Sequence, residues 1–285
     1  MHPAQTVLLL FALLSLGASA PAIRFAAALP LAVVAWRVAL AFPVLALVSA
    51  LRRDRWPIRQ AAPAGIFLAA HWVCWVIAVQ RTTIASAALL ICTGALWSAL
   101  LSRPLLGEPV SRRQWTGLTL ALLGVAAVVT NELGGQHSVA GDLYALGGSL
   151  AWVAYTFIGR RARQSAGFWG YTAALYLTAG LIVTALAVGR AVPLLGFSTT
   201  TWGALLVLAI FPTLLGHGTW NYLLRFIGPV TLSLWALSEP VLATLAGWAL
   251  FGETPGLRVL LGGVATIAGV ALGVSGQPAD RLGPP

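Results

Sequence analysis

The sequence contains no lysine and only seven acidic residues, and charged residues of all kinds make up 8% of it. A water-soluble domain carries roughly a quarter charged residues and uses them to cover its surface. This chain cannot do so, because 59% of its 285 residues are hydrophobic and its mean hydropathy is +0.88. The composition therefore excludes a soluble enzyme, a nucleic-acid-binding domain and a disordered chain.

The missing lysine and the scarcity of cysteine exclude two further classes. A P-loop needs its lysine, so this chain alone is not an ATP-driven pump. Cys74 and Cys92 lie in apolar stretches without metal-ligand spacing, and no H-E-x-x-H sequence occurs. We expect no metal and no cofactor, and we interpret the two cysteines as small buried side chains.

Long hydrophobic runs account for most of the sequence. A helix that crosses a bilayer needs roughly 20 mostly apolar residues, and turn or charge signals separate ten such runs here. The sequence therefore predicts an all-α integral membrane protein with ten transmembrane helices and a cytoplasmic tail at 276–285. The predicted spans are 4–21, 29–51, 61–80, 84–103, 113–131, 141–159, 167–189, 201–224, 228–251 and 257–275.

The first of these runs also has features of a secretory signal peptide. Residues 7–16 resemble its apolar core, and Ala18-Ser19-Ala20 resembles a cleavage site. No basic residue precedes the run, and Pro21 would follow the cut. We therefore interpret the segment as a retained membrane helix.

The arginines predict how the chain is oriented. All 17 basic residues are arginines. If the N-terminus is inside, the cytoplasmic loops and the tail hold twelve of them and the outer loops hold four. Such an excess marks the cytoplasmic side. We expect a multi-pass protein of a bacterial-type inner (plasma) membrane with both termini in the cytoplasm. The remaining arginine, Arg37, lies within a predicted span.

The two halves of the chain are related by an internal duplication. Shifting the sequence by 145 positions superposes Trp75 on Trp220, Gly107-Glu108 on Gly252-Glu253, Gly117 on Gly262, and Gly124 on Gly269. Each half, 4–131 and 141–275, holds five predicted helices, so the second half enters the membrane inverted. Inverted repeats usually place a substrate site between the halves and rock around it. The duplication therefore predicts a transporter with a central cavity.

The ends of the two halves resemble a known family. The matching stretches are Leu106-Gly107-Glu108-Pro109 with Gln114 to Gly124, and Phe251-Gly252-Glu253-Thr254-Pro255 with Leu257 to Gly269. They are similar to the EamA domains of the drug/metabolite transporter (DMT) superfamily, over about residues 5–275. In its abundance of tryptophan, the sequence resembles one group within this superfamily, the YddG-type exporters of aromatic and other amino acids. The resemblance implies that helices 1, 3, 4, 6, 8 and 9 line a cavity, with helices 5 and 10 packed behind.

Helical spacing selects candidate cavity residues. His71 and Trp75 are i and i+4, and Trp152 and Tyr155 are i and i+3, so each pair shares a helix face. His217 shares a face with Trp220 and Asn221 in the same way. Such faces combine a flat apolar surface with a hydrogen-bonding group, as a cavity for an amphipathic solute requires. Facing lipid, a His or Asn side chain would be unpaired.

Two ionisable residues lie near the middle of predicted spans. A charge there costs roughly 2.5–3.5 kcal/mol on insertion scales and indicates function by default. We expect Glu239 to face the cavity and to interact with a charged group of the substrate or to bind a proton. Pro240 frees the carbonyl of Ala236 and predicts a broken helix beside this carboxylate. For Arg37 we favour a structural role, through backbone carbonyls, Glu239 or a water-filled vestibule.

Trp97 and Trp235 are added to the candidates because they lie on helices that the resemblance places at the cavity. The predicted substrate-binding residues are then His71, Trp75, Trp97, Trp152, Tyr155, His217, Trp220, Asn221, Trp235 and Glu239. Glu108 and Glu253 lie at loop turns, and we interpret them as helix caps.

An intramembrane serine protease is an alternative from a different class. The pattern G-x-S occurs at Gly17-Ala18-Ser19 and at Gly147-Gly148-Ser149. A serine nucleophile needs a base, for which His71 and His217 are the membrane-embedded candidates. Because G-x-S is common in glycine-rich helices, we prefer transport and expect no enzyme.

The sequence as a whole indicates an inner-membrane secondary transporter that exports small organic solutes by alternating access. Amino acids, aromatic ones among them, are the first candidates, and broader metabolite or drug efflux by the same fold is the alternative. Facilitated diffusion and proton antiport are both open. The expected partners are the small-molecule substrate and the lipid bilayer, with no nucleic acid. The oligomeric state is open, and a monomer is compatible with the sequence.

Overall fold

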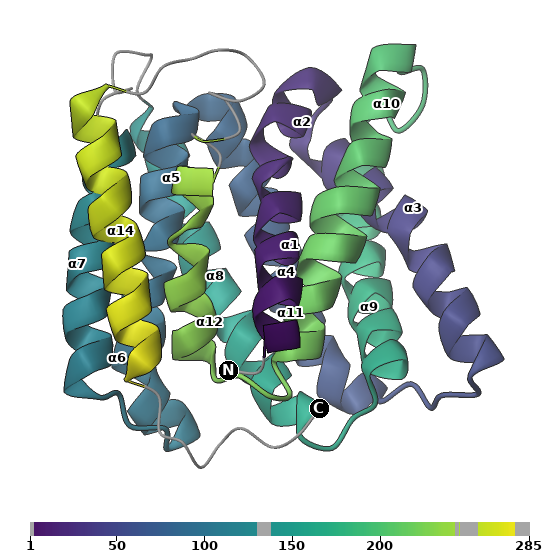
Figure 1. Cartoon of the computed structure of the whole chain (residues 1–285). Helices are drawn as coiled ribbons and strands as arrows, with labels where there is room; N and C mark the ends of the chain where they lie inside the picture. The colour runs from purple at the N-terminus through teal and green to yellow at the C-terminus, as the bar shows by residue number, and fades with distance from the viewer. Residues whose placement is uncertain (1–2, 130–137, 243–244, 246–255, 277–285) are drawn as a thin grey trace.

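The computed structural model describes residues 3–129, 138–242, 245 and 256–276 (Figure 1). Every regular element in these ranges is a helix, and none of the residues they cover forms a strand, as the composition predicts. The elements are α1 (Pro3–Gly17), α2 (Ser19–Ala26), α3 (Pro30–Leu51), α4 (Ile58–Arg81), α5 (Ile84–Cys92), α6 (Gly94–Leu106), α7 (Arg112–Val129), α8 (Val139–Arg163), α9 (Phe168–Gly189), α10 (Thr199–Leu208), the π-helix η2 (Ala209–His217), α11 (Gly218–Leu223), α12 (Pro229–Ala236) and α14 (Leu257–Ser275).

Seven helical segments among the described residues are long and apolar enough to cross a bilayer. They are Ala4–Ala26, Pro30–Leu51, Ile58–Arg81, Ile84–Leu106, Phe168–Gly189, Thr199–Leu223 and Leu257–Ser275. The predicted spans 113–131 and 141–159 overlap α7 and α8, which are helical but do not belong to these seven. The predicted span 228–251 and the predicted tail lie partly outside the described residues. The number of ten spans therefore stays a prediction.

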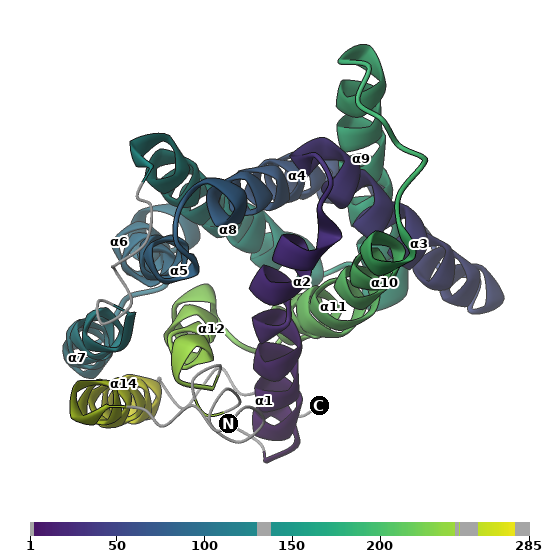
Figure 2. The ribbon, with the colours of Figure 1, turned by 90° about the horizontal axis from the view of Figure 1, so that it is seen from above.

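The long helices run side by side, and Figure 2 shows how they are grouped. α7 and α14 lie together at one edge of the bundle, whereas α3 lies against α9 on the far side. Between these groups, α4 packs on both α8 and α9, and α1 packs on η2. α1, α4, α8 and α12 approach the middle of the bundle from different sides (Figure 2).

Glycines allow α7 and α14 to pack backbone against backbone. A Cβ atom on Gly117 would lie 2.4 Å from the carbonyl oxygen of Gly269, and one on Gly124 would lie 2.6 Å from that of Gly262. Small residues permit this close approach between membrane helices. Gly117 corresponds to Gly262, and Gly124 to Gly269, so the two contacts exchange equivalent positions. A twofold axis between inverted halves produces this reciprocity.

The π-helix η2 forms around Pro212. Proline has no N–H group to donate to the carbonyl four residues earlier, which here belongs to Leu208. The Thr213 hydroxyl donates to that carbonyl instead, at 2.7 Å. The Tyr176 hydroxyl in turn donates to the carbonyl of Thr213, at 2.6 Å. Such turns are often found at functional sites, and η2 ends at His217, a predicted site residue.

α12 is interrupted at the position that Pro240 predicts. It ends at Ala236, a turn follows at 237–238, and helix resumes at Glu239. Pro240 cannot donate to the carbonyl of Ala236, which removes one bond that would continue the helix. The Ser238 hydroxyl donates to the carbonyl of Trp235, at 2.5 Å. The predicted break is therefore confirmed, and Glu239 lies beside it.

The start of α1 and the end of α14 lie at the same end of the bundle, the lower end in Figure 1. Gly276, after α14, packs there against Ser111 at the start of α7: a Cβ atom on the glycine would lie 2.6 Å from the serine hydroxyl. The Arg160 side chain at the end of α8 also reaches this end, where it meets Glu108.

Candidate functional site

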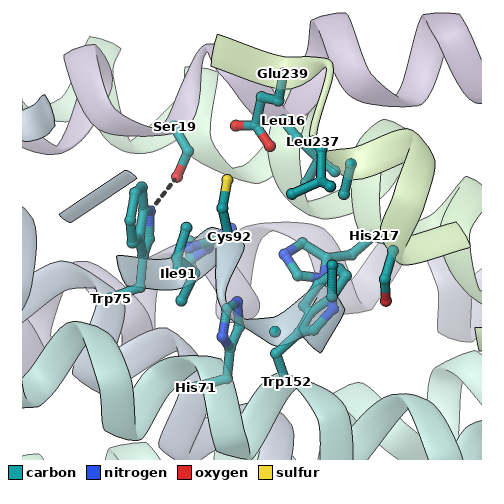
Figure 3. Close-up of a pocket in the computed structure, with 15 residues that line it drawn as sticks. Leu16, Ser19, His71, Trp75, Ile91, Cys92, Trp152, His217, Leu237 and Glu239 are labelled. Atoms are coloured by element: carbon teal, nitrogen blue, oxygen red, sulfur yellow. Dashed lines mark hydrogen bonds between the residues drawn. The ribbon is translucent and has the colours of Figure 1, made fainter. Parts of the chain in front are cut away.

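A cavity of about 90 Å³ lies among helices of both repeats. It has room for several water molecules. Its wall comes from α1, α2, α3, α4, α5, α6, α8, η2, α12 and the residues just after α12 (Figure 3). The lining residues are Leu16, Ser19, Arg37, His71, Trp75, Ile91, Cys92, Gly94, Ala95, Trp152, His217, Ser233, Ala236, Leu237 and Glu239.

Three rings form an aromatic side of this cavity. The ring centroid of His71 lies 5.1 Å from that of Trp152 and 5.8 Å from that of His217. The Trp152 and His217 centroids are 5.4 Å apart. These separations allow edge-to-face and offset contacts, which hold flat groups in fixed positions. Figure 3 shows His71 and Trp152 on the side of the cavity opposite Glu239.

Hydrogen bonds fix the protons of the two histidines. The indole Nε1 of Trp72 can only donate, and it lies 3.0 Å from Nε2 of His217, which must accept. The proton of His217 is therefore on Nδ1. Nδ1 of His71 lies 2.9 Å from the carbonyl oxygen of Gly148, so this nitrogen donates. In the neutral rings, His217 has a free donor at Nδ1 and His71 an acceptor at Nε2.

Arg37 is the one charged side chain that α3 brings to this wall. Its exposed fraction is 0%, and its Nε donates to the hydroxyl of Thr213 at 2.9 Å. Its guanidinium carbon lies 4.7 Å from the centroid of the Trp72 ring, which favours a cation–π contact. The expected structural partners, backbone carbonyls or Glu239, form no hydrogen bond or ion pair with it within the described part of the chain.

Glu239 contributes a carboxylate at the opposite side of the cavity (Figure 3). The side chain is half-buried, at the point where helix resumes after the turn at 237–238. Among residues 3–129, 138–242, 245 and 256–276, none forms a hydrogen bond or an ion pair with it. The carboxylate can therefore accept hydrogen bonds from a solute within the cavity.

Half of the predicted substrate-binding residues line the cavity. These are His71, Trp75, Trp152, His217 and Glu239. Trp75 lies on the wall next to α2 because its indole Nε1 donates to the hydroxyl of Ser19, at 3.1 Å.

The other five do not belong to the lining. They are Trp97, Tyr155, Trp220, Asn221 and Trp235. The fully buried rings of Tyr155 and Trp220 pack behind Trp152, at centroid separations of 5.5 and 4.7 Å. The Asn221 amide in α11 donates to the carbonyl of His217 at the end of η2, at 2.8 Å. An i+3 neighbour is rotated about 60° around the helix, enough to leave the cavity side.

Sequence reasoning missed other lining residues. For Arg37 the sequence analysis favours a structural role, although a charge within an apolar run is itself a signal of function, and the side chain lines the cavity. The sequence presents Ser19 as a candidate nucleophile and as part of a cleavage-site-like stretch, and Cys92 as a small buried residue, whereas both line the cavity. Nothing in the local sequence distinguishes the last two from other small residues of apolar helices.

The protease alternative lacks the geometry it needs. The Ser19 hydroxyl accepts the Trp75 bond, and the Ser149 hydroxyl lies 3.1 Å from that of Thr93. A nucleophile and its base should lie within hydrogen-bond distance. Within the described part of the chain, neither serine forms a hydrogen bond with His71 or His217.

An ion pair joins helix ends at the lower end of the bundle. Nη2 of Arg160 lies 3.4 Å from Oε1 of Glu108. The same arginine donates to the carbonyls of Leu224 and Arg225, at 2.8 and 2.9 Å. Gly228 belongs to this contact, because a Cβ atom there would lie 2.8 Å from Glu108 Oε2. Together these bonds connect the ends of α6, α8 and α11.

The fold and the cavity define a class: a membrane protein, helical throughout its described residues, with a cavity among helices of both halves. A model of the EamA-like transporter family matches residues 5–130 and 139–275. The chain therefore belongs to the EamA-like transporter family and is a membrane transporter of the DMT type. Members of this family are transporters and not enzymes.

Three relatives and one solved structure place the chain further. The uncharacterized transporter YyaM of Bacillus subtilis is 27% identical over 83% of this chain and 81% of its own length. The probable amino-acid metabolite efflux pump of Salmonella typhimurium is 26% identical over 67% of each chain. This chain spans 60% of the uncharacterized transporter YdfC of Bacillus subtilis, at 27% identity. A crystal structure with 20% identity has a TM-score of 0.79 and covers 95% of this chain and 96% of its own, which shows the fold.

Proposed function

We propose that this transporter exports small organic solutes, amino acids first among them, across the inner membrane by alternating access around the cavity. The observation that carries the proposal is the composition of the cavity wall. Aromatic rings lie on one side, and the carboxylate of Glu239 lies on the other without a partner among the described residues. A solute with a flat or apolar side chain and an ammonium group complements both sides.

The ammonium group of the solute offsets the free-energy cost of holding the half-buried Glu239 carboxylate partly away from water. Isolated charges away from water are unfavourable unless they are paired. Glu239 is the acidic residue that lines this cavity, and a protonated amine within it can form a charge-assisted hydrogen bond with the carboxylate. The rings of Trp75 and Trp152 then contact the rest of the solute.

Two further observations support this proposal. The Salmonella relative is named a probable amino-acid metabolite efflux pump, which favours the same substrate class for this chain. Both described ends of the chain lie at the end of the bundle where Arg160 meets Glu108. The excess of arginine in the loops of that end favours a cytoplasmic location for it and for both termini.

Counterflow in proteoliposomes tests the proposal. Vesicles with the purified protein are loaded with unlabelled L-phenylalanine, L-leucine, L-alanine or tetraphenylphosphonium, and uptake of the same labelled compound is followed. Protein-free vesicles are the control. We expect counterflow of amino acids, with phenylalanine and leucine ahead of alanine. Counterflow of the lipophilic cation alone would overturn amino-acid export and favour broader drug efflux.

A further inference from the structure

The Arg37 guanidinium carries two nitrogen atoms that the fold leaves unpaired. Nη1 and Nη2 are fully buried and have no hydrogen-bond partner within the described part of the chain. The rest of the group is held firmly, with Nε bonded to Thr213 and the plane beside the Trp72 ring. Buried donors without partners are rare because each costs the free energy of lost hydration.

A second unpaired donor belongs to His217. Its Nδ1 is buried and has no partner among the described residues, while Nε2 accepts from Trp72. The Trp72 bond requires the proton to be on Nδ1, so this atom is a donor. Arg37 and His217 line the same cavity, and both contact the ring of Trp72.

The unpaired N–H groups of Arg37 and His217 would be satisfied best by an anionic hydrogen-bond acceptor, because the guanidinium is a cation. Glu239 lines the same cavity but forms no ion pair with Arg37 in the described chain. The geometry points to a carboxylate-binding site at Arg37 and His217. A carboxylate fits the fork of Nη1 and Nη2 with two parallel hydrogen bonds.

This site deepens the proposed function and rests on it. A zwitterionic amino acid would place its carboxylate at Arg37, its ammonium group at Glu239 and its side chain against Trp152. The cavity then selects solutes that carry a carboxylate. An amine of the same shape leaves the guanidinium unpaired, and an amide offers one neutral acceptor in place of the two charged oxygens, so the site should reject both analogues.

A panel of four phenyl compounds tests the site on the wild-type protein. L-Phenylalanine, L-phenylalanine amide, phenethylamine and 3-phenylpropionate compete with labelled L-phenylalanine in counterflow. We expect phenylalanine to compete about 10- to 100-fold better than its amide, as the loss of hydrogen bonds to a charged group implies. Equal competition by the amide and by phenylalanine overturns the carboxylate site.

Variants assign the selectivity to a residue. In Arg37→Met, the ratio between the concentrations of the amide and of phenylalanine that give half-maximal competition should fall toward one. Competition by 3-phenylpropionate should disappear. Arg37→Lys keeps the charge and loses the fork, so an intermediate ratio is expected. Arg190→Met is the matched control because this exposed arginine lies outside the cavity, and its ratio should equal that of the wild type.

The outcomes separate this inference from the proposed function. Phenylalanine flux with an unchanged ratio in Arg37→Met overturns the site and leaves amino-acid export standing. Counterflow of labelled 3-phenylpropionate without phenylalanine flux supports the site and overturns amino-acid export. Activity with phenethylamine alone, or with none of the four compounds, overturns both. If Arg37→Met does not fold, the preference of the wild-type protein for phenylalanine over its amide decides whether the cavity binds a carboxylate.

Discussion

The indole Nε1 of Trp72 donates a hydrogen bond to Nε2 of His217, and the two residues lie 145 positions apart, the offset that relates the two halves of the sequence. They are therefore equivalent positions of the two repeats. Equivalent positions can touch only where the axis that relates the repeats passes. The bond joins α4 to η2 at this axis, next to the cavity that His217 lines.

Trp72→Phe removes this bond while it keeps an aromatic ring in place. Nε2 of His217 then loses its donor, and His217 becomes free to take the other tautomer. We expect a destabilisation of about 1 kcal/mol, as for other hydrogen bonds between membrane helices. Thermal unfolding in detergent measures it. Trp97→Phe is the control, because its indole nitrogen has no partner among the described residues. Equal losses in both variants would contradict the role of the bond.

Gly269→Leu should prevent α7 and α14 from packing. A Cβ atom at Gly269 would lie 2.4 Å from the backbone nitrogen of Ala121, and the helix backbone cannot move away without loss of the interface. We expect little folded protein in size-exclusion chromatography. Gly203→Ala is the matched control, since nothing lies within 4 Å of its Cβ position. That variant should be neutral or gain up to about 1 kcal/mol from helix propensity. Normal folding of Gly269→Leu would contradict the predicted backbone contact.

Glu239→Gln should leave folding intact and weaken solutes that carry an ammonium group. No described residue depends on this carboxylate for a hydrogen bond or ion pair, so thermal stability should change little. Competition by phenethylamine and phenylalanine should fall about tenfold or more, while 3-phenylpropionate is spared. If the residue instead couples protons, uphill flux driven by a pH gradient disappears and counterflow persists. Full transport at every pH would contradict both roles.

Glu108→Gln should loosen the contact among the ends of α6, α8 and α11. The Arg160 ion pair is lost, although the bonds from Arg160 to the Leu224 and Arg225 carbonyls can persist. We expect faster labelling of Cys92 by a reagent applied on the side of the membrane that this end of the bundle faces, because the helix ends separate more often when the contact is weakened. Arg161→Gln is the control on the same turn of α8; its side chain donates to the Leu105 carbonyl, and it takes no part in the ion pair. Equal labelling rates in Glu108→Gln and the wild type would contradict the role of this contact in closure.

Most of the helical fold could be predicted from hydropathy and from the internal repeat, because apolar runs and repeated glycines can be recognised in each half of the sequence separately. Gly117 and Gly124 repeat at Gly262 and Gly269, and in the structure each glycine packs against the partner that a twofold axis requires. Pro240 predicted the break after Ala236 because a missing N–H is a local property.

The cavity wall was harder to predict because it depends on how helices rotate against each other. His71 and Trp75 share a face and both reach the cavity, whereas Trp220 shares a face with His217 and packs behind Trp152. Spacing along one helix cannot separate the two cases. The contacts of the Arg37 side chain could not be predicted for another reason: its partners, Thr213 and Trp72, are distant in sequence.

Cys92 offers the most direct measurement of the central claim, that the cavity between the repeats binds the transported solute. The chain has two cysteines, and Cys92 lines the cavity whereas Cys74 does not. In a Cys74→Ser protein, the rate at which a small methanethiosulfonate reagent modifies Cys92 is measured with and without L-phenylalanine. We predict that phenylalanine at ten times its dissociation constant slows modification roughly tenfold, as occupancy of one site requires. A protein that transports phenylalanine while Cys92 reacts at an unchanged rate would contradict the account.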